Sequence, residues 1–337
     1  MGGPDNPQAV KPFLRNLFRD PAIIDAPAPI REGLAWLIST LREKSAQKNY
    51  AIMGGGSPLL PETEKQARLL KDLLEEYLDN TEVRVFPAMR YWHPFIEDVV
   101  SEIENWAPDE TVLLPLYPQF STTTTGSSLS AWKKAGGGKA RSICCYPTQD
   151  DFIKAHVSLI RAEWMIAGQP KKARLLFSAH GLPEKTIAKG DPYQHQISLT
   201  ATEIAKQLPE LDDWKICFQS RVGPMKWIGP STDEAIIEAS QSGHHIILAP
   251  IAFVSEHIET LVELDEEYLL LAEENGVVGY NRVPALGCHT DYIEGLSKLV
   301  LNALNDDQPI ASSCGQRICP DSFSQCPCKG VEKAITT

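Results

Sequence analysis

The sequence contains no apolar run of about 18 residues, which is the length that a membrane-spanning helix needs. Its first residues, MGGPDNPQAV, lack the pattern of a secretory signal. The sequence also has no excess of basic residues, since it contains 32 Lys and Arg but 44 Asp and Glu. This acidic balance argues against a general nucleic-acid-binding protein. We therefore expect a cytoplasmic protein whose eight cysteines are reduced or metal-bound rather than paired in disulfides.

A nucleotide-binding signature is also absent. The glycine-rich stretch GGGSP at 54–58 has neither the lysine of a P-loop nor the spacing of a dinucleotide fingerprint. We interpret it as a tight turn. The absence of a GxGxxG pattern weighs against a nucleotide-dependent oxidoreductase.

Apolar, β-branched runs alternate with amphipathic stretches, and this alternation is typical of parallel α/β units. Strands are predicted at EVRVFPA (82–88), TVLLPLY (111–117), SICCYP (142–147), ARLLFSA (173–179), WKICFQS (214–220), HIILAPI (245–251) and VGYNRVP (278–284). Helices are predicted at 62–80, 94–106, 151–167, 193–208, 231–242 and 289–305.

The 337 residues suggest about two domains of this kind. The polar stretch GQPKK at 168–172 marks a boundary between them, which gives domains at 1–168 and 169–305. Residues 306–337 are rich in Ser, Pro and Cys, and we expect them to form a separate extension. In open α/β sheets, sites lie beyond the carboxyl ends of strands, and the unusual stretches RYWHP, SAHGLP and QSRVGPMKWIGP all follow predicted strands. Their position predicts one cleft between the two domains.

The stretch SEHIETLVELDEEY at 255–268 carries six acidic residues among fourteen. Charge-rich helical faces are most often solvated, and Glu256 and Asp265 are interpreted in that way. Glu259, Glu263 and Glu267, however, are spaced by four residues, and such a row drifts by about 40° per step on a regular α-helix. A π-type widening would straighten the row and make a path for a cation. Spacing alone leaves both interpretations open.

Several motifs together resemble the ferrochelatases, enzymes that insert Fe²⁺ into a porphyrin. They are GGP at 2–4, GGGSP at 54–58, RYWHP at 90–94, YPQFSTTTTGSS at 117–128, FSAHGLPEK at 177–185, GDPY at 190–193, QSRVGPMKWIGPSTDE at 219–234 and APIAFVSEHIETLVELDEEY at 249–268. The resemblance covers nearly the whole chain. It implies two Rossmann-like domains, each with a parallel four-stranded sheet flanked by helices, and a π-type distortion in the acidic helix. The family normally has a first strand that ends in GGP, and that strand is missing from this sequence.

The activity that the resemblance implies is insertion of Fe²⁺ into protoporphyrin IX, a lyase reaction that forms protoheme, releases two protons and completes heme biosynthesis. His180 and Glu259 match the catalytic and metal-contacting pair. The implied metal path comprises His257, Glu263 and Glu267, and the implied porphyrin-binding residues are Met1, Arg90, Tyr91 and Trp227. Members that act on coproporphyrin typically have a tyrosine at the position of Met1, so the protoporphyrin type is favoured.

An amphipathic stretch near the N-terminus, VKPFLRNLF, places Val10, Phe13, Leu14, Leu17 and Phe18 on one face. This face has two possible explanations. It is either packed in the core, or it forms an apolar lip of the pocket that contacts the inner surface of the membrane peripherally. The sequence leaves open whether the protein is a monomer or a homodimer. Two other classes fit the sequence less well: an iron–sulfur electron carrier, against which the absent GxGxxG pattern weighs, and a two-domain solute-binding protein, which the missing secretory signal disfavours.

The tail holds Cys314, Cys319, Cys326 and Cys328 in the spacing C-x4-C-x6-C-x-C. Four thiolates can bind zinc or an iron–sulfur cluster, and spacing does not decide between them. Many ferrochelatases carry a 2Fe-2S cluster at the C-terminus, so the resemblance favours the cluster. In some members one ligand comes from the domain body, which makes Cys314 the weakest of the four. The remaining cysteines, Cys144, Cys145, Cys217 and Cys288, are predicted to be core residues.

Overall fold

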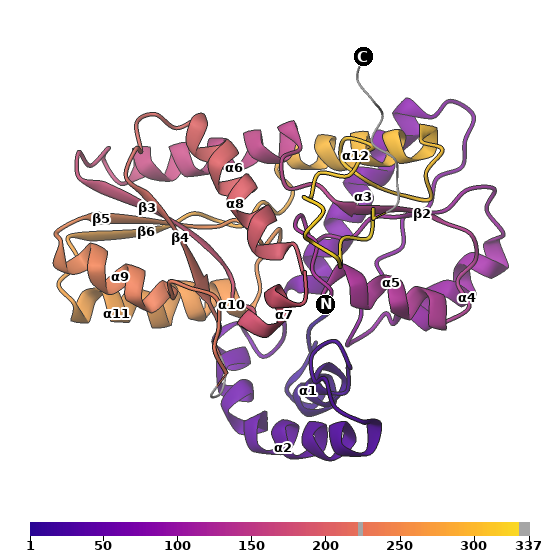
Figure 1. Cartoon of the computed structure of the whole chain (residues 1–337), viewed down its shortest axis with the longest axis horizontal. Coiled ribbons are helices and arrows are strands. Elements are labelled where there is room, and N and C mark those ends of the chain that lie inside the picture. Colours follow the sequence, from indigo (N-terminus) through magenta and orange to yellow (C-terminus); the bar gives the residue numbers. More distant parts are fainter. Residues whose placement is uncertain (222–224, 330–337) are drawn as a thin grey trace. The chain divides into compact units, whose positions relative to one another are not determined.

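The computed structural model describes residues 1–221 and 225–329 of the chain (Figure 1). Contacts within the chain define two compact units. Unit 1 comprises Met1–Leu113 and Ser121–Arg141, and unit 2 comprises Leu114–Phe120 and Ser142–Thr337. The domain boundaries at 168 and 305 stay predictions.

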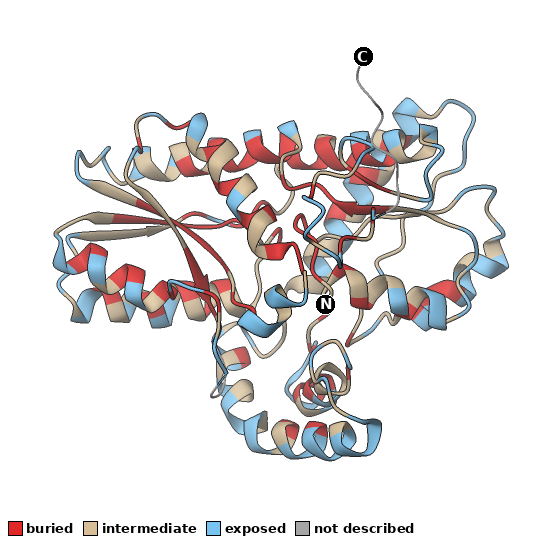
Figure 2. Cartoon of the chain, viewed as in Figure 1, coloured by how far each residue is buried: buried red, intermediate tan, exposed pale blue. Residues whose placement is uncertain are grey.

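Unit 2 is built on a parallel sheet with the strand order β4-β3-β5-β6. Its strands are β3 (Ala173–His180), β4 (Trp214–Gln219), β5 (His245–Pro250) and β6 (Gly279–Arg282). All four lie in segments that the sequence predicts as strands. Leu175, Leu176 and Phe177 are successive residues of β3 and all are fully buried, as expected for a strand with helices on both faces. Figure 2 shows the burial of this sheet.

Helices cover both faces of the four-stranded sheet, with α6 and α8 on one side and α9 and α11 on the other (Figure 1). The helices of unit 2 are α6 (Asp150–Ile166), α7 (Glu184–Ala188), α8 (Tyr193–Lys206), α9 (Thr232–Gln241), α10 (Ile258–Leu261), the π-helix η2 (Glu263–Glu267), α11 (Tyr268–Glu274) and α12 (Thr290–Asn305). One core cluster joins Leu176 and Leu248 of the sheet to Ile236 of α9 and Leu264 of η2. The π-helix is therefore fixed to the sheet through its one buried side chain.

A second parallel pairing in unit 2 joins β2 (Arg141–Cys145) to β7 (Ile310–Ser312). The register shifts between Ile143 and Cys145, so β2 carries a bulge at Cys144. Strand β7 lies in the segment 306–337, which the sequence predicts to be a separate extension, and it pairs with β2. The last segment of the chain completes a sheet, and Cys319, Cys326 and Cys328 are all buried.

Unit 1 is mainly helical. Its elements are η1 (Pro7–Ala9), α1 (Val10–Phe18), α2 (Ala28–Ile52), α3 (Leu59–Tyr77), α4 (Ile96–Trp106), the short strand β1 (Val112–Leu113) and α5 (Thr125–Lys134). The parallel α/β class with two sheets flanked by helices is confirmed; among the described residues the second sheet has the order β1-β2-β7, and the predicted strand at 82–88 is not assigned.

Helix α1 packs against α2, which decides how its apolar face is used. Val10, Phe13 and Leu14 are buried in this contact, so they form core and not an exposed lip. Among the described residues, no helix combines the length and the apolar character required to span a membrane.

Candidate active site

His180 is the last residue of β3, and it pairs in register with Gln219, the last residue of β4. Both side chains are therefore at the carboxyl end of the sheet, where α/β proteins place their sites. Gly181 follows, and a Cβ atom there would lie 2.9 Å from the main-chain oxygen of Gln219. The glycine thus allows the chain to leave β3 close against β4, directly beside the histidine.

Glu259 of α10 lies between two histidines. Its Oε2 is 3.2 Å from Nδ1 of His180 and 3.6 Å from Nε2 of His257. The His180 side chain is 36% exposed and that of Glu259 is 28% exposed. This partial exposure leaves the pair accessible to a ligand. The contact with Glu259 holds the imidazole of His180 in one orientation.

Electrostatics fix the charge state of this pair. Burial alone would lower the pKa of His180, but the Glu259 carboxylate outweighs burial and the pKa of His180 rises above its ordinary value. Burial alone would raise the pKa of Glu259, but the two histidines, His180 foremost, hold it well below its usual range. The fold therefore favours a proton on the histidine and a charge on the carboxylate.

The π-helix gives Glu263 an unusual set of partners. The main-chain N–H of Glu267 donates to the oxygen of Val262 at 3.0 Å, five residues back, which confirms the predicted π-type widening. The Glu263 carboxylate accepts hydrogen bonds from Ser220 N (2.8 Å), Ser220 Oγ (2.5 Å), Gln219 Nε2 (3.0 Å) and Tyr268 OH (3.1 Å). Burial and the neighbouring Glu259 nevertheless raise the pKa of Glu263.

Gln219 links the two glutamates. Besides its bond to the Glu263 carboxylate, its Nε2 donates to the main-chain oxygen of Glu259 at 2.8 Å. Glu267, the third member of the predicted row, is exposed. The structure thus brings Glu259 and Glu263 together next to His180, with Glu267 at the surface.

Glu256 and Asp265 are not solvated acids, and this prediction is wrong. Both form ion pairs with Arg282 of β6, at 2.5 Å and 2.6 Å. Glu256 also accepts a hydrogen bond from the main-chain N–H of Ala285 at 2.9 Å. Because the guanidinium binds residues on both sides of α10, it fixes the helix that carries Glu259.

Two aromatic residues of unit 2 lie close to His180. Trp227 forms a bridge with Pro183, and its ring lies 3.4 Å from the position that a Cβ of Gly181 would occupy. Tyr193, at the start of α8, is hydrogen-bonded to the backbone of His180. Trp227 was predicted from the resemblance, whereas Tyr193 was not singled out.

Unit 1 contains a second group of polar residues around Arg90. Arg90 pairs with Asp20 at 2.9 Å and donates from Nε to Ser127 Oγ at 2.8 Å, while Tyr91 OH donates to Asp20 at 2.8 Å. Ser127 also donates to Asp20. Burial alone would raise the pKa of Asp20, but these donors hold it below its usual value.

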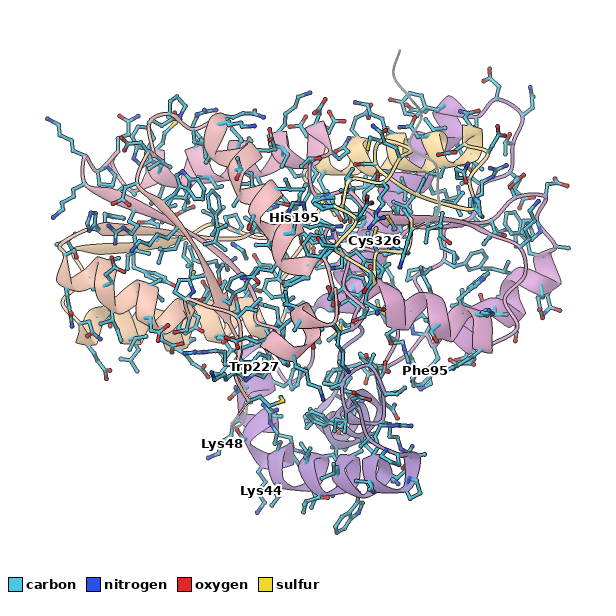
Figure 3. All side chains as sticks on the ribbon, viewed as in Figure 1. Lys44, Lys48, Phe95, His195, Trp227 and Cys326 are labelled. Carbon is cyan, nitrogen blue, oxygen red and sulfur yellow. The ribbon has the colours of Figure 1, made fainter. Side chains whose placement is uncertain are left out.

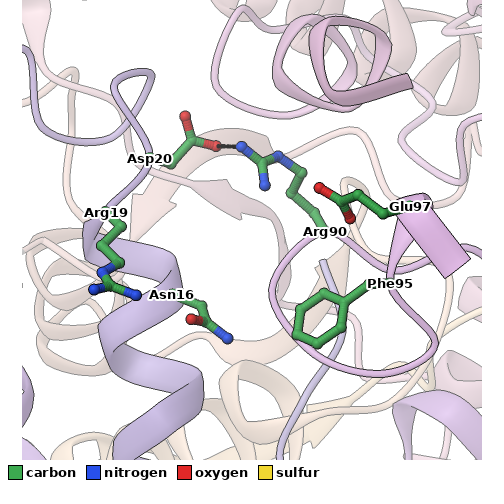
Figure 4. Close-up of a pocket in the computed structure, with 6 residues that line it drawn as sticks. All are labelled: Asn16, Arg19, Asp20, Arg90, Phe95 and Glu97. Atoms are coloured by element: carbon green, nitrogen blue, oxygen red, sulfur yellow. Dashed lines mark ion pairs between the residues drawn. The ribbon is translucent and has the colours of Figure 1, made fainter. Parts of the chain in front are cut away.

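A pocket of about 220 Å³ lies beside this network (Figure 4). It is lined by Asn16, Arg19, Asp20, Arg90, Phe95 and Glu97. Tyr91 is buried, and its hydroxyl is bound by Asp20, so its ring supports Arg90, whose guanidinium stacks over it at 5.1 Å. Met1 is 36% exposed, and its main-chain oxygen accepts hydrogen bonds from the N–H groups of Arg90 and Tyr91. The sequence offered no signal for Asp20 or Ser127, because their roles depend on contacts distant along the chain.

The buried thiols of unit 2 form a group that the sequence did not reveal. One apolar cluster contains Cys144, Cys145, Cys319, Cys326 and Cys328. The Cys144 sulfur lies 3.2 Å from that of Cys145 and 3.4 Å from that of Cys328. Successive side chains of a regular strand point to opposite faces, so the bulge in β2 is what brings two neighbouring cysteines to one group.

Cys314 is exposed and hydrogen-bonds to Ser312 instead of joining the thiol group. Its predicted place among the four ligands is therefore not supported by the contacts. Figure 3 labels Cys326 within the C-terminal segment. Within residues 1–221 and 225–329, no three or more His, Cys, Asp or Glu side chains are arranged to hold a single metal ion.

The protein is of the chelatase fold class, a class defined by its likeness to solved chelatase structures. A solved structure entitled SirB from Bacillus subtilis with Fe³⁺ has this fold, with a TM-score of 0.50 and 14% identity, covering 72% of this chain and 89% of that chain. The family model named Ferrochelatase matches residues 1–304. Ferrochelatases from Caulobacter vibrioides (strain NA1000 / CB15N) and Hyphomonas neptunium (strain ATCC 15444) are each 57% identical, over 98% and 97% of this chain and 95% and 92% of their own. The chain belongs to the ferrochelatase family, which confirms the resemblance.

Proposed function

We propose that this protein is a ferrochelatase that inserts Fe²⁺ into protoporphyrin IX, forming protoheme with release of two protons, a lyase-type reaction at the end of heme biosynthesis. The observation that carries the proposal is the His180–Glu259 contact of 3.2 Å at the carboxyl end of β3, in a chain that belongs to the ferrochelatase family. Fe²⁺ and the porphyrin are both substrates here.

The chemistry requires a base. A free porphyrin carries two N–H protons at its centre, and its nitrogen lone pairs lie in the ring plane. Because Nδ1 of His180 lies 3.2 Å from the Glu259 carboxylate, we assign the proton of neutral His180 to Nδ1, which leaves Nε2 as the basic nitrogen. We propose that Nε2 accepts the pyrrole proton. The imidazolium that forms is then stabilised by the adjacent carboxylate.

Glu259 is the second catalytic residue in this proposal, and His257 orients it from the other side. Glu263, held by four donors, adds fixed negative charge behind Glu259. We propose that this charge and the exposed Glu267 draw the cation toward the pair.

The porphyrin is a large apolar disc with two propionates. We propose that Trp227 and Met1 contact the disc and that Arg90, with its pocket, receives a propionate. Tyr91 would act through Arg90, because its ring is buried under the guanidinium. Met1, where a coproporphyrin type would have a tyrosine, favours protoporphyrin IX.

The direct test is absorbance spectroscopy of purified protein with protoporphyrin IX and anaerobic Fe²⁺ or Zn²⁺. The bands of the free porphyrin are expected to convert to those of the metalloporphyrin at a rate that depends on protein concentration. His244→Ala provides a matched control. This histidine pairs with Asp213 at 3.1 Å and directly precedes β5, so it lies at the amino end of the strands, away from His180. Equal rates with and without protein would contradict the proposal.

The pH profile offers a prediction about the His180–Glu259 pair. Proton acceptance needs neutral His180, so kcat/KM should rise with pH through a pKa above the ordinary value of 6.5. In Glu259→Gln the carboxylate that raises this pKa is gone while burial, which lowers it, remains. The rising limb should therefore move to lower pH even as the maximal rate falls.

Initial rates of zinc insertion between about pH 5 and 9 measure this limb, and that range brackets ordinary histidine titration. The control is Glu266→Gln, which removes an exposed carboxylate from the same segment. A limb in Glu259→Gln that stays in place or moves to higher pH would show that Glu259 does not set the charge of the base.

The same proposal includes a 2Fe-2S cluster, held by Cys319, Cys326, Cys328 and one cysteine of the Cys144–Cys145 pair. The donor set fits, because five buried thiols meet in one cluster of unit 2. Such a cluster needs two thiolates on each iron, and this group offers five buried thiols. When bound, the cluster would supply one-electron chemistry and a cross-link between β2 and the C-terminal segment.

Peripheral membrane contact is a further part of the proposal, and the structure suggests a different surface from the predicted lip. Ile30, Leu34, Leu37 and Leu41 recur on one face of α2, and all four are exposed, Leu41 by 72%. Lys44 and Lys48 project from the same helix (Figure 3) and suit an anionic surface. Such a helix would bring a cytoplasmic protein to the inner face of the membrane, where protoporphyrin partitions.

Vesicle co-sedimentation tests this surface. Replacing both Leu37 and Leu41 by glutamate should weaken binding to anionic vesicles by about a hundredfold or more, because each leucine that is buried in the membrane contributes roughly 1.5–3 kcal/mol. Ile166→Glu, which alters an apolar residue that is 73% exposed at the end of α6, is the control. Equal binding of the double variant and the control would exclude α2 as the contact.

A further inference from the structure

Gln196 lies one turn into α8, and its side chain is fully buried against the thiol group. Its Nε2 lies 3.1 Å from the sulfur of Cys319 and 3.4 Å from the sulfur of Cys145. One amide thus reaches a cysteine of the tail and a cysteine of β2 at the same time.

The orientation of this amide is determined by its other end. Oε1 of Gln196 accepts a hydrogen bond from the main-chain N–H of Phe120 at 2.7 Å. Because that N–H can only donate, the oxygen must face Phe120 and the two N–H groups must face the sulfurs. Gln196 therefore presents both of its donors to two sulfurs of the proposed cluster ligands.

We propose that Gln196 is a positioning residue that sets the reduction potential of the 2Fe-2S cluster by donating hydrogen bonds to the sulfurs of Cys319 and Cys145. This inference rests on the proposed cluster. Reduction adds negative charge, and much of that charge is carried by the sulfurs, so hydrogen-bond donors favour the reduced state and raise the potential. The effect is strong at this place because the amide and the two cysteines are buried, where a hydrogen bond is screened little by water.

A purely structural role for Gln196 is the competing explanation, since its contacts also join α8 to the C-terminal segment. The two explanations differ in one measurable quantity. A structural tie affects how much cluster is retained, whereas the donor role affects the potential of the cluster that is retained. The potential therefore has to be measured per assembled cluster.

Anaerobic redox titration followed by absorbance and electron paramagnetic resonance makes this measurement on the full-length protein. Gln196→Leu removes both donors, and Gln194→Leu, a half-buried residue two positions earlier on α8, is the control. We expect Gln196→Leu to disfavour reduction by about tenfold, which equals a potential about 59 mV more negative for one electron. The control should keep the parent potential.

Gln196→Glu provides a second readout that does not require loss of the side chain. A carboxyl at this position would take up a proton as the cluster is reduced, so the potential should acquire a pH dependence, up to about 59 mV per tenfold change in proton concentration. The parent amide cannot titrate. This slope would distinguish a donor facing the sulfurs from a residue that only fills space.

The possible outcomes distinguish the presence of the cluster from the role of Gln196. If the parent protein assembles no iron and sulfide, the proposed cluster itself is wrong. If the parent assembles the cluster and Gln196→Leu matches the control in potential, the role of Gln196 is wrong and the cluster stands. Loss of the cluster from both Gln196 variants but not from Gln194→Leu would assign Gln196 to assembly and overturn the tuning role.

Discussion

Replacing His180 by alanine is expected to lower kcat for metal insertion by about 10²- to 10⁴-fold, the usual contribution of a positioned acid–base group. Two pyrrole protons must leave, and the Nδ1 contact with Glu259 orients His180 and stabilises the imidazolium that proton acceptance produces. The fold should survive, because the side chain is 36% exposed and ends a strand whose core is formed by Leu175, Leu176 and Phe177.

Single-turnover insertion, alongside a fluorescence titration of porphyrin binding, separates chemistry from affinity. Porphyrin should still bind to His180→Ala, because Trp227 and Arg90 are unchanged. His257→Ala should be milder, since that imidazole lies 3.6 Å from Glu259 and acts only through it. A His180→Ala protein that turns over within about threefold of the parent, well below the range for a general base, would exclude His180 as the proton acceptor.

The second large effect is expected at the thiol group. The parent protein, purified without oxygen, should contain about two irons and two sulfides per chain, and Cys326→Ser or Cys328→Ser should lose nearly all of both. Each of these thiols is buried, so neither can be replaced by a ligand from solvent. Iron and sulfide analysis with visible absorbance measures the loss. Stoichiometric zinc without sulfide in the parent would contradict the cluster.

The fourth ligand is expected to come from β2 and not to be Cys314. Cys314→Ser should keep the cluster, because Cys314 is exposed and bound to Ser312. The double variant Cys144→Ser, Cys145→Ser should lose it, because the bulge in β2 brings these two sulfurs to the group. Loss in Cys314→Ser with retention in the double variant would reverse the assignment.

The strands of unit 2 were predictable because each is a short apolar run followed by a turn or a motif. ARLLFSA and HIILAPI became β3 and β5 with few changes of boundary. The run EVRVFPA has the same character but forms no strand, because a strand depends on a partner that sequence pattern does not report. Helix α2 was missed for a related reason: several of its apolar residues, including Trp36, are exposed, so no buried stripe stands out.

In the acidic segment, residue spacing predicted the backbone conformation but not the partners of every acid. Spacing by four suggested a widened helix, and the hydrogen bond from Glu267 to Val262 bears this out. Pattern could not separate Glu256 and Asp265 from true surface acids, because their partner, Arg282, comes from β6. Likewise, the spacing of the tail cysteines could not show that Cys144 and Cys145 lie beside them, since the pairing of β2 with β7 is a long-range contact.

That pairing also has a consequence for biosynthesis. Ser142 pairs with Ile310, so β2 keeps an open edge on that side until residue 310 has been synthesised and has emerged from the ribosome. Nascent chains that stop before residue 310 would present that edge together with the unpaired thiols of Cys144 and Cys145, which invites aggregation and recognition by quality control. Pairing of β7 with β2 thus removes this aggregation-prone edge.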